Sequence, residues 1–394
     1  MLGSVPERAG DPFGERPLSF VFVHTADWQL GKSYGRFEPD KAAILRRARD
    51  EAIDRLGRVA RTGQATHVLV AGDVFDSETL PDQLVRQTLR RLDAASDLTW
   101  HLLPGNHDPA RPGGIWDRVR AAGVPANVRL HLSVGVTEIS PGVQLLVAPL
   151  HAKSTTLDPT AWMDAAATPA GHLRLGLAHG SVQGFGSLGE AAVPIDPARA
   201  RKAGLTYLAL GDWHGVKQVG PAVWYSGTPE PDSFTQNDPG HALVVGLDGV
   251  SAPVRVSTVP TAAFRWLASQ VDVHRVSDLD HLVQEVAGAS EAVGSWLLEL
   301  SVSGRLAPPE MAELERRLSS LRDGLFDLRL DRDRLAVRAS VDDIADLGDG
   351  TARNVATKLA DLARGADAIE ARRAARALEM LFAIDAELVA GESA

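Results

Sequence analysis

Short apolar, β-branched runs recur along the first 260 residues and alternate with stretches of helical spacing. The runs that predict strands are 18–24, 67–71, 98–103, 143–149, 173–178 and 207–210. Between the first two, Ile44, Ala48, Ala52 and Leu56 predict a helix over 40–59, and Pro81 opens another. Strands alternating with helices, followed by strands in succession, predict a layered α/β sandwich around mixed sheets.

The pattern changes after about residue 260. Strands are predicted at 264–271, 296–302, 325–330 and 335–340, with helices at 278–286 and 308–321. This is typical of a small separate α/β domain of roughly 80 residues. Two helical stripes separated near Gly365 follow. We therefore expect a disordered tail at 1–17, a main domain at 18–260, an accessory domain at 261–340 and a C-terminal helical segment at 341–394.

Composition narrows the classes of protein that the chain can represent. The chain has 394 residues, is 44% hydrophobic and has no cysteine, so disulfides, thiolate catalysis and thiolate metal sites are excluded. Neither a signal peptide nor an apolar run of membrane-spanning length is apparent, so we expect a cytoplasmic protein without a membrane segment. The net charge of −10 argues weakly against non-specific binding to nucleic acid.

Polar residues gather where the apolar runs end. They form five blocks, T-A-D-W-Q at 25–29, G-D-V-F-D at 72–76, G-N-H-D at 105–108, A-H-G at 178–180 and G-D-W-H-G at 211–215. Because sites in α/β proteins lie at one edge of a sheet, we expect these carboxylate, amide and imidazole groups to meet. Mixed nitrogen and oxygen ligands favour Mn²⁺, Fe²⁺ or Zn²⁺ over Ca²⁺. Two such metals activate a water and clamp a phosphate.

Each block alone has an ordinary structural interpretation, because a single aspartate after a strand is usually a turn or N-cap residue. The five blocks in this order favour a metal site instead. Its candidate ligands are Asp27, Asp73, Asn106, His179, Asp212 and His214. His107 is a candidate catalytic residue that stabilises transition-state charge or protonates the leaving oxygen, and Asp108 is a candidate to orient its ring.

These blocks resemble the calcineurin-like metallophosphoesterases, and H-T-A-D-W-Q-L-G, G-D-V-F-D and P-G-N-H-D look most like the SbcD-type DNA repair exonucleases. The resemblance implies a four-layer αββα fold with an accessory (capping) domain. It also implies two divalent metals, usually Mn²⁺, and hydrolysis of DNA phosphodiester bonds. By motif position, Asp27 and His214 would hold one metal and Asp73 would bridge. Asn106, His179 and Asp212 would hold the other, and His107 matches the family's catalytic histidine.

Two positions depart from the family pattern. Gln29, the seventh candidate ligand, stands where the first block usually has histidine, and Asp212 replaces the first histidine of the last block. Both changes exchange an imidazole nitrogen for oxygen, and Gln29 offers only a neutral carbonyl oxygen. The harder donor set favours Mn²⁺ or Mg²⁺ over Zn²⁺. The alternative is that Gln29 does not ligate and that one metal is weakly held or lost.

The resemblance also implies partners. SbcD-type nucleases bind a large coiled-coil ATPase, the SbcC-type subunit, through C-terminal helices, and the helical segment at 341–394 is the candidate here. The competing interpretation is that these helices pack on their own protein or form a homodimer. Three functions stay open: a DNA nuclease of repair or defence, a phosphodiesterase or phosphatase acting on small molecules, and a binding subunit that has lost catalysis.

Overall fold

The computed structural model describes residues 19–184, 192–235, 237–288, 293–337, 344–345, 347 and 350–392. The tail expected at 1–17 lies outside the described residues. The chain divides into two compact units. The first comprises the chain up to Pro231 together with Asn237–Ala263, and the second comprises Asp232–Gln236 and everything from Phe264 onwards. The finer segment boundaries expected from the sequence stay predictions.

Two six-stranded sheets form the first unit. One sheet has the order β14 (Arg255–Pro260), β13 (His241–Leu247), β1 (Phe20–Thr25), β2 (His67–Val70), β3 (Thr99–Leu102) and β4 (Val128–Leu130). The other has the order β11 (Lys217–Gly220), β12 (Val223–Tyr225), β10 (Tyr207–Gly211), β7 (Leu173–His179), β6 (Val143–Ala148) and β5 (Gly135–Ser140). A small third sheet pairs β8 (Ser181–Val182) with β9 (Pro194–Ile195).

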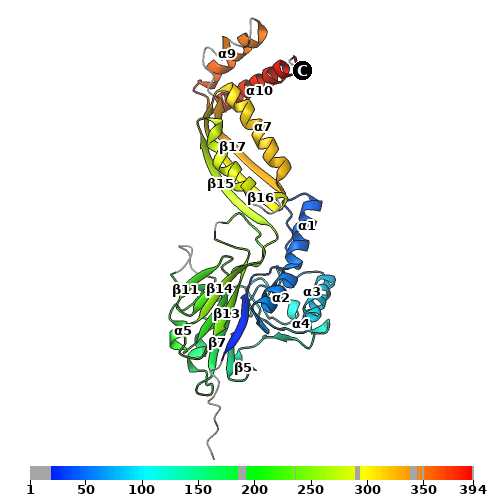
Figure 1. The fold of residues 1–394 in the computed structure, drawn as a ribbon, viewed down its shortest axis with the longest axis vertical. Helices are drawn as coiled ribbons and strands as arrows, with labels where there is room; N and C mark the ends of the chain where they lie inside the picture. The colour runs from blue at the N-terminus through cyan, green and yellow to red at the C-terminus, as the bar shows by residue number, and fades with distance from the viewer. Residues whose placement is uncertain are drawn as a thin grey trace, which may run out of the picture. The chain divides into compact units, whose positions relative to one another are not determined.

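Helices cover the outer faces of both sheets, as Figure 1 shows. Those on the first sheet are α2 (Ala52–Thr62), α3 (Asp82–Ala94) and α4 (Ile115–Ala121), and α1 (Pro39–Asp50) contacts α2. On the second sheet lie η1 (Ala161–Ala165) and α5 (Arg199–Lys202). The two sheets bury a core between them that includes Phe22, Leu69 and Leu175. The four-layer α/β sandwich expected from the resemblance is confirmed.

The first helical prediction differs in detail from the structure. The single helix expected at 40–59 is two helices that meet at Glu51, whose backbone N–H caps α1 by donating to the Arg47 carbonyl. Leu45 is buried instead of Ile44, which is 48% exposed. The apolar spacing continues through the break, so periodicity alone gives no sign of it.

The second unit is built on a three-stranded parallel sheet in the order β15 (Arg265–Val273), β16 (Trp296–Leu306) and β17 (Asp327–Val337). The helical turns η2 (Val276–Leu279) and η3 (Val293–Ser295) and the helices α6 (Asp280–Gly288) and α7 (Pro308–Gly324) accompany it, and Leu314 and Leu318 of α7 pack on the sheet. Two strands were expected over 325–340, and the structure has the one strand β17. Charged residues at 331–334 interrupt the apolar run, and an edge strand tolerates them because one of its faces meets water.

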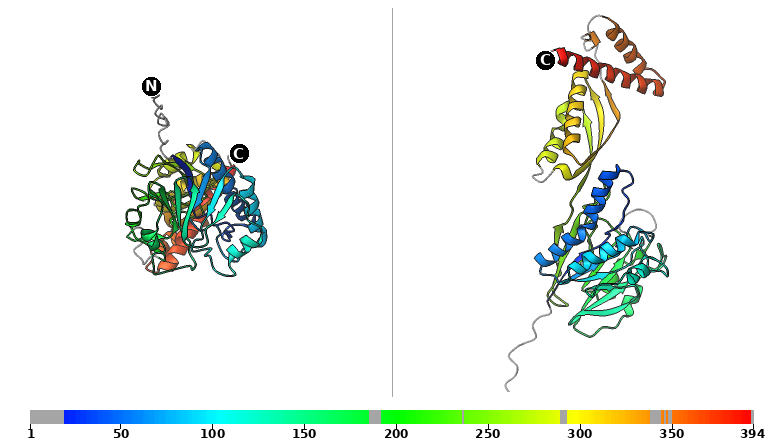
Figure 2. Two further views of the ribbon diagram at one scale, coloured as in Figure 1. Left: turned by 90° about the horizontal axis from the view of Figure 1, so that it is seen from below. Right: turned by 90° about the vertical axis from the view of Figure 1, so that its right-hand side faces the viewer.

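The last two helices are α9 (Thr351–Ala363) and α10 (Ala368–Glu392). The right-hand view of Figure 2 shows them beyond the three-stranded sheet of their unit. Ala356 and Ala360 of α9 pack against Leu378 and Phe382 of α10. Among the described residues, no helix is long and apolar enough to cross a membrane.

Candidate metal centre

All five polar blocks follow strands that lie side by side. In the first sheet β1, β2 and β3 are parallel, and the register pairs Thr25 with Val70 and His67 with Thr99. In the second sheet β7 and β10 are parallel, and His179 is paired with Gly211. Within each sheet, the loops that leave these strands therefore emerge at one edge, the arrangement that the sequence predicts.

Backbone hydrogen bonds join the first two loops. The Asp27 N–H donates to the Gly72 carbonyl at 3.1 Å, and the Gln29 N–H donates to the Asp73 carbonyl at 2.9 Å. The pairing continues as an isolated parallel bridge between Leu30 and Phe75. The two aspartates are thus held at a fixed separation by main chain and not by their own side chains.

The aspartates occupy backbone conformations that L-residues rarely adopt. Asp27 and Asp73 both have φ near +53°, Gln29 has φ +44° and Asp212 has φ +103°. Each such residue costs on the order of 1–3 kcal/mol and persists only where the surroundings enforce it. Four of them within one cluster indicate that side-chain placement at this edge is maintained at the expense of backbone stability.

Three candidate ligands meet at the centre of the cluster. The ligand atoms of Asp27, Asp73 and His179 all lie within 4.8 Å of one another, and the three side chains are buried. The His179 Nδ1 donates to the Ala71 carbonyl at 2.8 Å, so its Nε2 faces the site. This nitrogen lies 3.0 Å from Asn106 Oδ1 and 3.6 Å from Asp73 Oδ1.

The charges gathered in the cluster suit a cation. Burial raises the pKa of Asp27 to about 6, an effect that His214 and His179 partly offset. Burial lowers the pKa of His179, but the carboxylates of Asp73, Asp27 and Asp212 outweigh it and raise that pKa to about 9. Carboxylate oxygens therefore converge on the His179 imidazole. A divalent metal fits the same donor set, and this set is of the oxygen and nitrogen type that Mn²⁺ accepts.

The last block lies on the other side of Asp27. The Asp212 N–H lies 3.2 Å from both Asp27 carboxylate oxygens, and Asp212 Oδ1 lies 3.9 Å from His179 Nε2. Ser181 donates its hydroxyl to Asp212 Oδ2. Gln29 Nε2 lies 3.2 Å from His214 Nε2. The structure therefore brings all seven predicted ligands into one neighbourhood, while their roles as ligands stay predictions.

The candidate catalytic histidine lies at the rim. The His107 N–H donates to Asp73 Oδ1 at 2.9 Å, and its ring Nδ1 donates to the Asp76 carbonyl at 3.0 Å. The side chain is 45% exposed, and Nε2 lies 4.0 Å from Asp73 Oδ2. An imidazole held through one nitrogen, with the other near the buried Asp73 carboxylate, is well placed to meet a substrate.

Asp108 is placed differently from the expectation that it orients the His107 ring. Both of its carboxylate oxygens accept backbone N–H groups, from Gly105 at 2.6 Å and from Phe75 at 3.0 Å. Burial, together with the Asp73 carboxylate, raises the pKa of Asp108 well above its usual range. Asp108 joins the second and third loops, and the Asp76 carbonyl takes the orienting place.

One buried residue that positions the site was not predicted. Arg49 of α1 is 1% exposed and donates to the Trp28 carbonyl at 2.7 Å, the Glu230 carbonyl at 2.7 Å and the Tyr34 hydroxyl at 2.9 Å. Trp28 lies between Asp27 and Gln29, so this guanidinium fixes the first loop from behind. In the sequence it resembles any solvent-facing arginine of the R-R-A-R run, which is why the pattern did not identify it.

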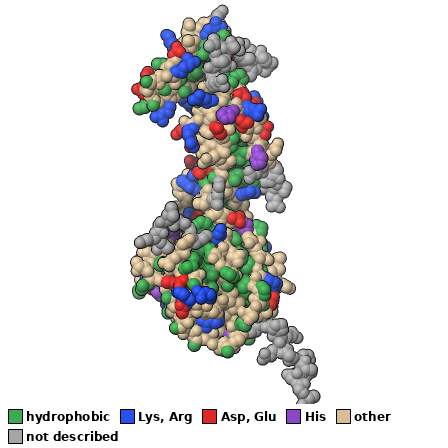
Figure 3. Space-filling model, turned by 90° about the vertical axis from the view of Figure 1, so that its left-hand side faces the viewer, with side chains coloured by type: hydrophobic (Ala, Val, Ile, Leu, Met, Phe, Trp, Pro, Cys, Tyr) green, Lys and Arg blue, Asp and Glu red, His purple; other side chains and the backbone are tan. Residues whose placement is uncertain are grey.

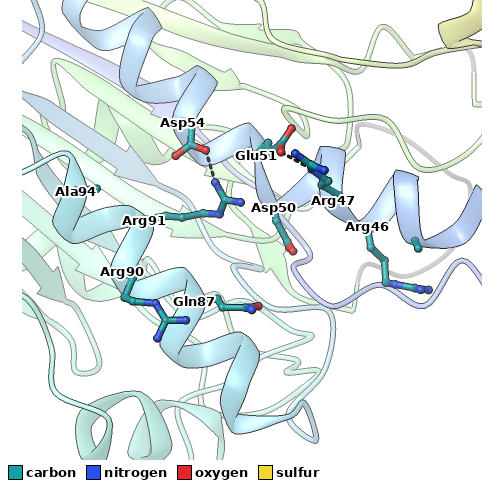
Figure 4. A pocket seen from close by; sticks show the side chains of 10 residues that line it. Arg46, Arg47, Asp50, Glu51, Asp54, Gln87, Arg90, Arg91 and Ala94 are labelled. Carbon is teal, nitrogen blue, oxygen red and sulfur yellow. Dashed lines mark hydrogen bonds and ion pairs between the residues drawn. The ribbon is translucent and has the colours of Figure 1, made fainter. Parts of the chain in front are cut away.

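A charged hollow lies apart from these residues. It has a volume of about 770 Å³ and is lined by residues of α1, α2, α3 and their junction, as Figure 4 shows. Arg47 pairs with Glu51 at 2.7 Å, and Arg91 pairs with Asp54. None of the predicted ligands lines this hollow, and four of its charged side chains pair with one another. It therefore adds nothing to the metal centre.

Comparison with known proteins agrees with this centre. The family model of the calcineurin-like phosphoesterases matches residues 20–191, the segment that holds Asp27, Asp73, Asn106, His107 and His179. The chain carries a calcineurin-like phosphoesterase domain and is a metal-dependent phosphoesterase.

Two curated relatives extend the match. The chain is 24% identical over 374 residues to the SbcD subunit of the SbcCD nuclease of Bacillus subtilis (strain 168), a match that spans 82% of this chain and 90% of the relative. It is also 24% identical over 258 residues to the DNA double-strand break repair protein Mre11 of Methanosarcina acetivorans, covering 64% of this chain and 40% of the relative. Among solved structures, TT1561 of Thermus thermophilus aligns with a TM-score of 0.38 and 14% identity, over 62% of this chain and all of that one.

Proposed function

We propose that the chain is an SbcD-like DNA nuclease that hydrolyses phosphodiester bonds in DNA repair or defence, in the cytoplasm. The observation that carries the proposal is the buried Asp27, Asp73 and His179 cluster with the exposed His107 ring beside it. The relative that matches along most of the chain is named as a nuclease subunit. A phosphoesterase centre and that relationship together favour a nucleic-acid substrate over a small one.

The proposed centre holds two divalent metals, Mn²⁺ by preference. Asn106, His179, Asp73 and Asp212 would hold one, and Asp27, Asp73 and His214 the other. When bound, such metals activate a water and stabilise charge on the phosphoryl group. The residues themselves do the rest. Main-chain hydrogen bonds between the first two loops fix the separation of Asp27 and Asp73, and the Ala71 carbonyl holds the Nε2 of His179 towards the site.

His107 is the proposed catalytic residue. Its Nδ1 is engaged by the Asp76 carbonyl, so Nε2 is the atom that meets the substrate. There it stabilises charge on the phosphoryl oxygens or delivers a proton to the oxygen that leaves when the P–O bond breaks. General acid catalysis of this kind contributes about 10²–10⁴-fold to rate.

Degradation of linear duplex and single-stranded DNA with Mn²⁺ tests the proposal, with Asp73→Asn as the control variant. We expect the wild-type chain to degrade DNA and the variant to leave it intact. Because Asp73 is 2% exposed and would be a ligand of both proposed metals, the amide would remove a shared carboxylate with little change of shape. Absence of DNA cleavage by the wild-type chain, with hydrolysis of a generic phosphodiester retained, contradicts the nuclease assignment.

That outcome would favour the second candidate, a phosphodiesterase or phosphatase for small molecules. The observation in its favour is the negative net charge of the chain. The chain carries a net charge of −10, and on the face shown in Figure 3 acidic and basic side chains are interspersed without a continuous basic stripe. Because DNA binding draws much of its affinity from lysine and arginine at phosphates, such a surface binds DNA weakly by itself.

A coiled-coil ATPase of the SbcC type is the proposed partner, and it would supply further DNA contacts. Helices α9 and α10 bury one apolar stripe between them and expose another, with Ile369, Met380 and Ile384 each more than half exposed. A chain truncated after residue 340 should lose the ATPase in a co-purification assay. If the truncated chain still recruits it, the helices are not the binding segment, and a homodimer seam becomes the better explanation for their exposed face.

A further inference from the structure

Lys32, Gln29 and His214 form a hydrogen-bonded line at one side of the metal centre. Lys32 Nζ lies 3.1 Å from Gln29 Oε1, and Gln29 Nε2 lies 3.2 Å from His214 Nε2. The Gln29 residue is 2% exposed, whereas the Lys32 side chain is 30% exposed. Lys32 Nζ also lies 4.0 Å from Asp76 Oδ1. The glutamine is thus fixed inside the protein by a cation that reaches in from its surface.

The chemistry of Lys32 decides which way the Gln29 amide points. An ammonium group only donates hydrogen bonds, so the amide atom that faces it is the oxygen. The amide nitrogen then faces His214 and donates to the lone pair of its Nε2. The reverse orientation would set the amide N–H₂ against the ammonium, donor against donor. With Lys32 in place, the lone pair that a metal would take from His214 is occupied, and the Gln29 oxygen is turned away from it.

We propose that the Lys32–Gln29 pair lowers the affinity of the metal position between Asp27 and His214, so that the chain holds one divalent cation tightly and a second one weakly. This inference rests on the proposed two-metal centre. At the other position, the Ala71 carbonyl engages the Nδ1 of His179, and the atom nearest its Nε2 is Asn106 Oδ1 at 3.0 Å, which is itself a proposed ligand of the same metal. The Asp27 position must displace a hydrogen bond from His214, and it also meets the positive charge of Lys32. A second cation therefore binds only when Lys32 releases the glutamine.

Manganese binding to the full-length chain tests the inference by isothermal titration calorimetry and by electron paramagnetic resonance of free Mn²⁺. Lys32→Met removes the charge and the donor, so the Gln29 oxygen is free to turn into the site. A hydrogen bond to a charged group is worth enough that its loss should tighten the second Mn²⁺ by about tenfold or more, while the first is unchanged. Lys32→Gln, which removes the charge but keeps a donor, should tighten it by less.

Lys202→Met is the matched control, since it removes the same charge from α5, where Lys202 pairs with Asp196. It should bind Mn²⁺ like the wild type. Two equally tight ions in the wild type, or an unchanged second affinity in Lys32→Met, would overturn the inference and leave the metal-dependent nuclease intact. No tight Mn²⁺ in any of these chains would overturn the proposed function as well, so the two failures are distinguishable.

Discussion

Replacing Gly105 by alanine should disable the metal centre by steric overlap with Asp73. A Cβ at this position would lie 2.1 Å from Asp73 Oδ1 and 2.4 Å from the Asp73 backbone nitrogen. Relief of that overlap requires the second and third loops to separate by about 1 Å, given ordinary non-bonded contacts of about 3.5 Å. The Asp73 backbone nitrogen cannot be moved by rotating a side chain, so the loops themselves must move.

The expected loss of stability follows from the packing and the hydrogen bond that this movement disrupts. Overpacking costs about 1–3 kcal/mol, and loss of the bond from the His107 N–H to the Asp73 carboxylate adds about 1 kcal/mol. At about 2–4 °C per kcal/mol, the Tm of the metal-free protein should fall by roughly 4–16 °C. Because Asp73 carries the displaced carboxylate, tight Mn²⁺ binding should be lost at the same time.

Differential scanning calorimetry and Mn²⁺ titration measure the two effects separately. Gly135→Ala is the control, because a Cβ there meets nothing within 4 Å, and it should behave as the wild type. A Gly105→Ala chain with unchanged Tm and Mn²⁺ affinity would refute the claim that the loops are packed directly against Asp73.

Three further substitutions test other features of the protein. His107→Ala should bind Mn²⁺ normally and lose about 10²–10⁴-fold in turnover with a phosphodiester, and retained turnover would remove His107 from the mechanism. Burial lowers the pKa of His131 to about 4, so its ring is neutral in the folded state while the unfolded chain protonates near pH 6.5. The free energy of unfolding of the wild type, measured relative to that of His131→Asn, should therefore fall as the pH drops from 6.5 to 4. The slope should be at most about 1.4 kcal/mol per pH unit, and equal pH dependence of the two proteins would refute this. Arg55→Met leaves the Glu230 carboxylate buried without its ion pair and should cost about 3–5 kcal/mol of stability in urea unfolding, whereas Arg47→Met, at an exposed pair, should change little; equal effects would contradict the burial argument.

Much of the fold followed from apolar spacing, because the central strands of the two sheets are buried on both faces. In the sequence such strands are continuous apolar runs. An example is 143–148, where every residue is buried. The strand β5 was not predicted because Gly135–Ser140 lies at a sheet edge and is largely exposed, so its sequence carries no such run. The break between α1 and α2 was not predicted either, because the buried positions continue at the same helical spacing from one helix into the next.

The candidate site could be predicted at positions where a side chain able to bind a metal stands at the end of an apolar strand. Asp27, Asp73 and His179 each follow or end a buried strand, and the structure gathers them. Two features of the site depend on contacts between loops or across a turn, which residue types alone do not reveal. The place of Asp108 depends on backbone N–H groups of two loops, which carry no signature in side-chain identity. The hydrogen bond between Lys32 and Gln29 depends on the turn that brings residue 32 back over residue 29.

Hydrolysis of bis(p-nitrophenyl) phosphate by the purified chain tests the central claim most directly, because it needs neither DNA nor a partner. We predict turnover that requires Mn²⁺, is abolished by a chelator and is absent from Asp73→Asn, whose thermal unfolding should remain cooperative. Turnover that survives in the Asp73→Asn chain, or that persists without a divalent metal, would contradict the assignment of this buried cluster as the catalytic metal centre.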